Sequence, residues 1–427
     1  MDYASALDYI HGTYKFGSKL GLENITRLLD KLGNPQDDLK VIHVAGTNGK
    51  GSTVSFISKI LESAGYRVGI FTSPFLEKFT ERIRINDQEI PDGDLGRITG
   101  IVKEKVDEML SEGCAHPTEF EIVTAIAFVY YKEAQVDYVA LEVGLGGRMD
   151  STNVVKKPIM TVITPVDLDH TEFLGDTLYA VAGEKAGIIK NDVPCVIHPQ
   201  QAEAMKRIGE VATERNALLT VADIESREIL ETSLEGTSFA YHGETYKIGL
   251  CGAHQVNNAI VAMTVVEQLV DNKQCTVTHP QLLKGLATTK WGGRFEVMSH
   301  NPLVIIDGAH NLHGAIGLDK ALEVYLQGKK LGAVIGILGD KSYKEIVDLL
   351  APRFSSVVVT EPDNPRALAM ETLGALVEGY GIDVQYERNI QKAVDAGLAM
   401  QEVEGLIIFG SLYMIGAVRT YLNTKKM

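Results

Sequence analysis

The sequence predicts an α/β protein of two domains. From residue 39 to about residue 190, short apolar runs alternate with helical patterns, and the same alternation starts again after about residue 299. Residues 215–250, between these two parts, break the alternation and contain a predicted antiparallel hairpin. Strands that alternate with helices are typical of a mostly parallel sheet covered by helices. We therefore expect one α/β domain over residues 1–298, which includes the small antiparallel appendage, and a second over residues 299–427.

The strands of the first domain are predicted from five apolar runs. These are VIHVA at 41–45, RVGIFT at 67–72, DYVALEV at 137–143, IMTVIT at 159–164 and VPCVIH at 193–198. Since they are apolar on both faces, they are typical of buried parallel strands. Of the helices between them, residues 52–65 end at a glycine, and residues 118–134 open with Thr118 and Glu121 at the spacing of a capping box.

The appendage and the second domain have their own signals. Residues 237–250 alternate in a way that predicts a hairpin with its turn at His242 and Gly243. Five further strand-like runs, each followed by a plausible helix, then predict a Rossmann-like α/β domain. These runs are LVIIDG at 303–308, GAVIGIL at 332–338, SVVVTE at 356–361, IDVQYE at 382–387 and GLIIFG at 405–410.

Composition limits the partners of the protein. The chain has 427 residues, and 41 basic against 56 acidic side chains give a formal net charge of -15. This balance argues against nucleic acid or an anionic membrane as a partner and favours small molecules bound at local sites. The four cysteines lie far apart, without the spacing of a zinc site or disulfide framework. No signal-peptide pattern or apolar run of about 20 residues is present, so we expect a cytoplasmic protein. We also expect a monomer.

The strand at 41–45 leads into a glycine-rich turn, GTNGKGST, which is typical of a phosphate-binding loop. Its spacing departs from the common G-x-x-x-x-G-K-[ST] pattern, because valine stands at the place of the first glycine and Gly51 follows Lys50 where a hydroxyl is expected. Ser52 supplies a hydroxyl one residue later. Taken alone, Lys50 would be interpreted as a solvated surface lysine. Its position after Gly49 in this loop favours a contact with phosphate instead.

Polar side chains also follow the neighbouring predicted strands, where ligands of an open parallel sheet bind. Ser52, Ser73 and Glu142 offer the oxygen atoms that Mg²⁺ prefers beside nucleotide phosphates, whereas His170 is a less usual ligand. Each has a simpler interpretation when taken alone. Glu142 would be a charge at a strand end, His170 a packed histidine, and Lys185 an exposed helix residue.

The second domain places polar residues after two of its strands. Asp307, His310 and Asn311 follow the strand at 303–308, and Ser411 follows the last strand. Such residues are common in ordinary turns, so the pattern leaves open whether they bind a ligand. Polar strand ends on both domains favour a ligand cleft between them.

Seven motifs in order resemble the folylpolyglutamate synthase and dihydrofolate synthase family, a branch of the Mur-type ATP-dependent amide ligases. They are HVAGTNGKGST, FTSPFLEKFTERI, LEVGLGGRMDSTN, DHTEFLGDTLYAVAGEKAGIIK, GAHQVNNAIVA, IIDGAHN and GSLY. The resemblance covers nearly the whole chain and explains the unusual loop, because the family carries G-T-N-G-K-G-S. Leu312 and His313 depart from the proline and the small or acidic residue that often follow the Asn in this family.

The resemblance implies a role for individual residues. The implied ATP contacts are Gly49, Lys50, Gly51, Ser52, Asn258, Arg294 and Asp307. Ser73 and Glu142 would bind a first Mg²⁺, and Glu142 with His170 a second. Lys185 matches a lysine that is carbamylated in the family, and Lys50, His170 and Lys185 would serve catalysis. The implied folate or pteroate contacts are Phe75, Arg82, Thr118, Glu119, Phe120 and Asp150, and the implied glutamate contacts are His310 and Ser411.

The function implied is ATP-dependent addition of L-glutamate to a folate γ-carboxylate, and also to dihydropteroate, through an acyl phosphate. The first domain would then bind ATP and folate, and the second would be a glutamate-ligase domain. Two alternatives stay open. One is a Mur-type ligase that adds an amino acid to a nucleotide-linked cell-wall precursor, which should lack the TSPF segment. The other is a nucleotide-binding module without ligase activity.

Overall fold

The computed structural model describes residues 1–14, 17 and 21–425 of the chain. Contacts divide the chain into two compact units. The first unit comprises Met1–Phe75, Phe79–Ser226 and Asn257–Thr289, and the second comprises Leu76–Lys78, Arg227–Val256 and Lys290–Met427. The predicted boundary at 298/299 divides the chain at one point, whereas each of the two compact units is made of three separate segments. As a functional boundary it stays a prediction.

The described part of the first unit contains an eight-stranded sheet in the order β4-β3-β2-β5-β1-β6-β7-β8. Its parallel strands are β2 (Val68–Phe71), β5 (Tyr138–Glu142), β1 (Val41–Ala45), β6 (Met160–Ile163), β7 (Cys195–Ile197) and β8 (Leu219–Val221). The short strands β3 (Ile83–Ile85) and β4 (Gln88–Glu89) add an antiparallel edge. All five predicted strands are confirmed, and each lies within its predicted run.

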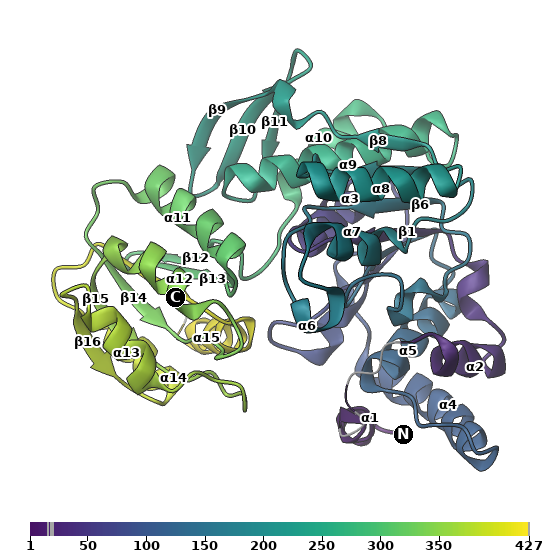
Figure 1. Cartoon of the computed structure of the whole chain (residues 1–427), viewed down its shortest axis with the longest axis horizontal. Coiled ribbons are helices and arrows are strands. Elements are labelled where there is room, and N and C mark those ends of the chain that lie inside the picture. The colour runs from purple at the N-terminus through teal and green to yellow at the C-terminus, as the bar shows by residue number, and fades with distance from the viewer. Residues whose placement is uncertain (15–16, 18–20, 426–427) are drawn as a thin grey trace. The chain divides into compact units, whose positions relative to one another are not determined.

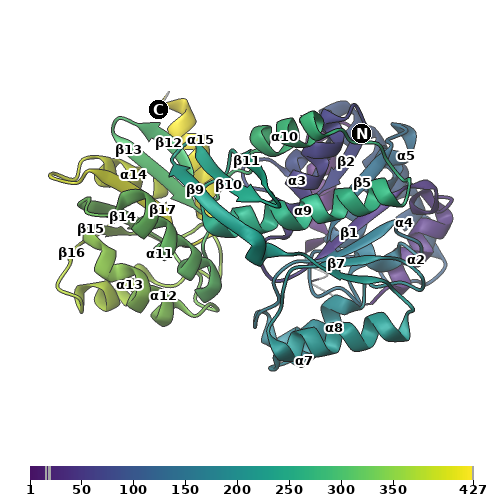
Figure 2. The same cartoon turned by 90° about the horizontal axis from the view of Figure 1, so that it is seen from above.

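Helices cover both faces of this sheet, and Figures 1 and 2 show α3, α9 and α10 on one side and α7 and α8 on the other. The helices of this unit are α1 (Tyr3–Gly12), α2 (Glu23–Lys31), α3 (Lys50–Ser63), α4 (Asp92–Ser111), α5 (Glu119–Glu133), α6 (Thr171–Leu174), α7 (Leu178–Ala186), α8 (Ala202–Glu214), α10 (His279–Thr288) and most of α9 (Ala253–Asp271). A buried apolar cluster joins α2, α4 and α5 to β1 and β5, and another joins α7 and α8 to β6 and β7. Burial of these apolar faces is the main force that holds the layers together.

Two predicted helix starts have different outcomes. The helix expected from residue 52 begins at Lys50, because Gly49 has a φ of +83° and serves as the N-cap. A left-handed N-cap suits glycine, which has no Cβ, so the turn closes two residues earlier than the sequence pattern suggested. The capping box is confirmed, since Thr118 and Glu121 hydrogen-bond each other's backbone N–H groups at the start of α5.

The second unit contains two sheets. The predicted hairpin forms as β10 (Gly236–Tyr241) and β11 (Glu244–Ile248), with positive φ at His242 and Gly243, and β9 (Arg227–Ser233) completes a three-stranded antiparallel sheet. This appendage groups with the second unit rather than with the first, where we expected it. One reason is the hydroxyl of Tyr325, which contacts Thr237 at 3.0 Å and accepts the N–H of Gly252 at 2.8 Å.

The larger sheet of the second unit confirms the predicted α/β alternation. Its order is β12-β13-β17-β14-β15-β16, and all neighbours are parallel except β12 and β13. The strands are β12 (Glu296–His300), β13 (Leu303–Asp307), β14 (Leu331–Ile335), β15 (Phe354–Val359), β16 (Asp383–Tyr386) and β17 (Gly405–Phe409). The helices are α11 (Leu312–Leu326), α12 (Tyr343–Leu350), α13 (Met370–Glu378), α14 (Ile390–Leu398) and α15 (Leu412–Thr424). Among the described residues, no helix has the length and apolar character to cross a bilayer.

Candidate active site

The glycine-rich loop between β1 and α3 has a geometry that only glycine permits at two positions. A Cβ on Gly46, whose φ is +152°, would lie 1.8 Å from Oγ1 of Thr164. A Cβ on Gly49 would lie 2.6 Å from Oδ1 of Asn258, so this predicted nucleotide contact stands directly against the loop. The first N–H groups of α3 have no acceptor within the helix, which makes this loop and helix start suited to a phosphate group.

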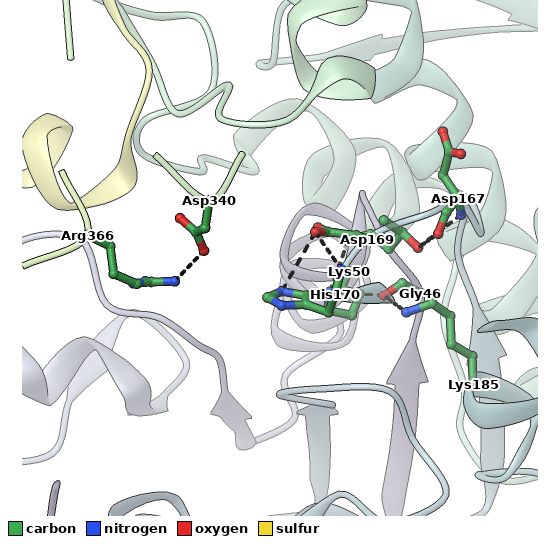
Figure 3. A network of polar contacts seen from close by, with 9 residues as sticks. Gly46, Lys50, Asp167, Asp169, His170, Lys185, Asp340 and Arg366 are labelled. Carbon is green, nitrogen blue, oxygen red and sulfur yellow. Dashed lines mark hydrogen bonds and ion pairs between the residues drawn. The ribbon is translucent and has the colours of Figure 1, made fainter. Parts of the chain in front are cut away.

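Two lysines converge on the loop from different elements. Lys50 Nζ donates to the carbonyl oxygens of Gly46 at 3.0 Å and Thr47 at 3.2 Å, and Lys185 Nζ donates to the Gly46 carbonyl at 2.9 Å (Figure 3). Lys185 lies near the end of α7 and is only 4% exposed, so its reading as an ordinary exposed helix residue is wrong. Burial and the nearby charge of Lys50 lower the pKa of Lys185 to about 7. A large share of this amine is therefore neutral near pH 7, and a neutral amine is a nucleophile.

The strand ends that the sequence singled out lie next to one another, because β2, β5, β1 and β6 are adjacent. Glu142 ends β5, is 4% exposed, and accepts the backbone N–H of Ser73 at 3.2 Å. His170 has a φ of +50° and precedes α6, with its Nε2 3.9 Å from Oδ1 of Asp169 (Figure 3). Parallel strands end at one edge of the sheet, which is why residues so distant in sequence gather there.

The donor atoms at this edge suit magnesium held together with nucleotide phosphates. Such a Mg²⁺ takes one or two protein carboxylates and completes its shell with phosphate oxygens and water. The buried carboxylate of Glu142 and the hydroxyl side chains of Ser52 and Ser73 are of this kind. No group of three or more His, Cys, Asp or Glu side chains arranged for a metal occurs in the described part of the chain.

An arginine surrounded by aromatic rings lies after β2 in the first unit. The guanidinium carbon of Arg82 lies 6.0, 5.6 and 5.9 Å from the ring centroids of Phe75, Phe79 and Phe120. Arg82 Nη1 lies 3.2 Å from Oε1 of Glu119. Burial alone would raise the pKa of Glu119, but the contacts with His11 and Arg82 lower it. The structure therefore brings together four of the six predicted folate contacts, and it adds His11, whose Nδ1 lies 3.9 Å from Glu119 and which no motif indicated.

The other two predicted folate contacts have structural partners of their own. The hydroxyl of Thr118 donates to Glu121 at 2.9 Å within the capping box. Asp150 caps the 3₁₀ helix Ser151–Val154 and accepts the N–H groups of Leu145 at 2.8 Å and Thr152 at 3.0 Å. Burial raises the pKa of Asp150, and these hydrogen bonds oppose the rise. The carboxylate thus holds the glycine-rich turn that follows β5.

In the second unit, Asp307 at the end of β13 accepts the N–H groups of Phe295 and Ala309, each at 2.7 Å. Burial raises the pKa of Asp307, and the charge of Arg294 opposes the rise, so these two predicted nucleotide contacts are neighbours. His310 Nδ1 lies 2.7 Å from the carbonyl oxygen of Gly308. Ser411 is 1% exposed, and its hydroxyl has no hydrogen-bond partner among the described residues. A buried hydroxyl without a partner is unusual and is suited to a ligand.

Comparison with known proteins defines the class. Residues 44–266 match the Mur ligase middle domain, and residues 293–412 match the Mur ligase glutamate ligase domain. These two matches place the chain among the Mur-type ligases. The class therefore agrees with the site built from the residues.

Relatives across the whole length narrow the class to one branch. The chain is 37% identical to the dihydrofolate synthase/folylpolyglutamate synthase of Bacillus subtilis and 36% identical to the folylpolyglutamate synthase of Lacticaseibacillus casei, with 99% of each chain covered in both comparisons. The structure of Mycobacterium tuberculosis folylpolyglutamate synthase complexed with ADP and AMPPCP aligns with a TM-score of 0.88 at 32% identity, over 99% of each chain. The chain belongs to the folylpolyglutamate synthase/dihydrofolate synthase family of Mur ligases.

Proposed function

We propose that this protein ligates L-glutamate to the γ-carboxylate of tetrahydrofolate polyglutamates, and also to dihydropteroate, with hydrolysis of ATP to ADP and phosphate. The observation that carries the proposal is the convergence of Lys50 and Lys185 on the carbonyl of Gly46, at a phosphate loop in a chain of this family. The loop accounts for ATP, and the second lysine distinguishes the site from a loop that only binds nucleotide.

The chemistry requires activation of a carboxylate. A carboxylate oxygen of the folate attacks the γ-phosphorus of ATP, the bond to the β–γ bridging oxygen breaks, and ADP leaves. The amine of glutamate then attacks the acyl phosphate, loses a proton, and displaces phosphate to form the amide. Phosphoryl transfer depends on positioning and on neutralising oxygen charge, so the Lys50 ammonium and the N–H groups at the start of α3 act on the phosphates without a covalent enzyme intermediate.

Mg²⁺ would neutralise phosphate charge when bound. We assign Ser73 and Glu142 to a nucleotide-bound ion and Glu142 with His170 to a second ion. Support for the first assignment comes from the buried Glu142 carboxylate and from its contact with Ser73. His170 is then a metal ligand rather than a general base.

Lys185 is proposed to be carbamylated. Its neutral amine would attack CO₂, form a nitrogen–carbon bond and release a proton, which replaces a potential cation by a carboxylate. The lowered pKa of Lys185 favours this reaction near pH 7. Lys185→Ala should lose most activity and recover part of it with added acetate or formate. Full activity of the variant without them would contradict the assignment.

The remaining contacts are assigned to three substrates. Beyond the loop residues Gly49, Lys50, Gly51 and Ser52, ATP would contact Asn258, Arg294 and Asp307. Folate or pteroate would contact Phe75, Arg82, Thr118, Glu119, Phe120 and Asp150. Glutamate would contact His310 and Ser411, and the buried hydroxyl of Ser411 supports that role.

One substrate panel tests the proposal. The protein is incubated with ATP, Mg²⁺ and glutamate, and in turn with dihydropteroate, tetrahydrofolate or a nucleotide-linked cell-wall precursor, and ADP and product mass are measured. A mass gain of one glutamyl residue on tetrahydrofolate is the expected result, and a gain on dihydropteroate would add the second activity. Ligation to the cell-wall precursor alone, or nucleotide binding with no product, would overturn the proposal.

A further inference from the structure

A buried chain of hydrogen bonds runs from the middle of the central sheet to the Asp150 carboxylate. His43, in β1, is 0% exposed, and its Nε2 lies 2.8 Å from Oγ1 of Thr152. The Thr152 hydroxyl in turn donates to Oδ1 of Asp150. Thr152 is also fully buried, so water does not compete for these contacts.

Packing alone does not explain a histidine at this position. Alternate residues of a strand share a face, and the neighbours of His43 on its face are the apolar Val41 and Ala45. His43 Nδ1 is buried and has no hydrogen-bond partner among the described residues. Leaving such a nitrogen unpaired costs free energy that an apolar side chain would avoid. The contact through Nε2 is therefore what distinguishes histidine from an apolar residue here.

The hydrogen-bond partners determine the direction of each proton. Asp150 accepts backbone N–H groups on both oxygens, so its carboxylate is an acceptor and takes the one hydroxyl proton of Thr152. The Thr152 oxygen then accepts from the Nε2–H of His43, which leaves the lone pair on Nδ1. Burial and the charge of Lys190 lower the pKa of His43 to about 3, in agreement with a neutral ring.

Asn153, the residue after Thr152, connects this segment to the turn after β5 and to the end of α7. Asn153 Nδ2 donates to the carbonyl oxygens of Arg148 at 2.9 Å and Gly187 at 3.2 Å. Gly187 stands two residues after Lys185. Residues 150–153 thus connect the central strand, the turn after β5 and the end of the helix that carries the buried lysine.

We propose that His43 is a positioning residue for the folate substrate, which acts through Thr152 to hold the Asp150 carboxylate and its turn in the orientation that contacts the pterin. The inference rests on the proposed function, because that function gives Asp150 its substrate contact. His43 itself touches no substrate.

The proton arrangement is tested first by NMR on the wild-type protein labelled with ¹⁵N-histidine. We expect one histidine to remain the neutral Nε2–H tautomer from about pH 5 to about pH 8. The ring ¹⁵N signals of this histidine should be absent from the spectrum of the His43→Gln variant, which assigns them to His43. An Nδ1–H tautomer for this residue, or its titration within that range, would overturn the proposed chain. This result does not depend on the activity of any variant.

Kinetics then test the effect on folate. His43→Leu and Thr152→Val should each raise the KM for the folate substrate about fivefold to tenfold, as expected for loss of a buried hydrogen bond, and leave the KM for ATP unchanged. The double variant should have about the same folate KM as the worse of the two single variants, because both substitutions break the same chain of hydrogen bonds. His43→Gln should recover part of the loss, since its amide N–H donates.

Thr161→Val is the matched control. Thr161 lies beside His43 on β6, is 0% exposed, and donates its hydroxyl to the carbonyl of Pro194 at 3.3 Å, with no link to Asp150. Its folate KM should equal that of the wild type. Unchanged folate KM in the His43 and Thr152 variants, or an equal rise in the control, would overturn the positioning role. If the wild-type protein ligates no glutamate at all, the proposed function fails instead.

Discussion

Lys185→Met should make the first unit more stable, and the gain should shrink as the pH rises. Methionine has a similar length and no charge, so it occupies the buried site without requiring a desolvated amine. The wild-type lysine is costly because its pKa is lowered from 10.5 to about 7 by burial, with a further contribution from Lys50. The unfolded chain therefore binds one more proton than the folded chain between these two values, and wild-type stability increases with pH through that window.

The size of the effect follows from the same two values. The difference of about 3.5 corresponds to roughly 5 kcal/mol at pH values below 7. At pH 9 the remaining cost is about 2 kcal/mol, because the buried amine is already neutral above pH 7 and each further pH unit reduces the cost by about 1.4 kcal/mol. Loss of the hydrogen bond to Gly46 offsets about 1 kcal/mol of the gain. The variant should thus gain about 4 kcal/mol at pH 6 and about 1 kcal/mol at pH 9.

The assay is urea unfolding followed by circular dichroism at several pH values in buffers depleted of CO₂, so that carbamylation does not contribute. The control is Lys156→Met, since the side chain of Lys156 is 70% exposed. The control should show no pH-dependent difference from the wild type. A stability difference for Lys185→Met that is constant or grows from pH 6 to pH 9 would refute the buried, neutral amine.

Three further predictions concern the site and the assembly. Lys50→Ala should lower kcat for ADP formation about 10²- to 10³-fold in steady-state kinetics, as for loss of a positioned charge, and a loss under tenfold would contradict the phosphate role. Gly49→Ala should raise the KM for ATP at least tenfold, because its Cβ would lie 2.6 Å from Asn258 Oδ1 and its φ is +83°; isothermal titration with ADP that shows wild-type affinity would refute this. The wild-type protein should elute as a monomer in size-exclusion chromatography with light scattering, and a dimer mass would show that prediction to be wrong.

Much of the fold was predictable because local patterns and tertiary structure agree. The run at 41–45 is apolar apart from His43 and forms a fully buried strand at the residues predicted. The capping box at Thr118 and the turn at His242 and Gly243 depend on neighbours within a few residues, so they are visible in sequence. The start of α3 at Lys50 was missed because it depends on a left-handed Gly49, which the pattern of apolar residues does not reveal.

The site was predictable only in part. Residues after parallel strands were expected to gather at one edge, and the contact of Ser73 with Glu142 agrees with this. The residue pattern of α7 does not indicate that Lys185 is buried, because the Gly46 loop that contacts it lies 139 residues earlier in the chain. His43 was hidden in an apolar strand, since its partner Thr152 is 109 residues away.

The alternation of strands and helices, the phosphate loop and the family could be predicted because they depend on short-range patterns and on motifs in series. Which side chains are desolvated, and which donors face which acceptors, depends on how the chain packs in three dimensions. A lysine on an exposed helix has an ordinary pKa, whereas burial and the nearby charge of Lys50 lower the pKa of Lys185 to about 7. Burial and hydrogen bonding are properties of the packed chain, and they turn residues of common type into candidates for chemistry.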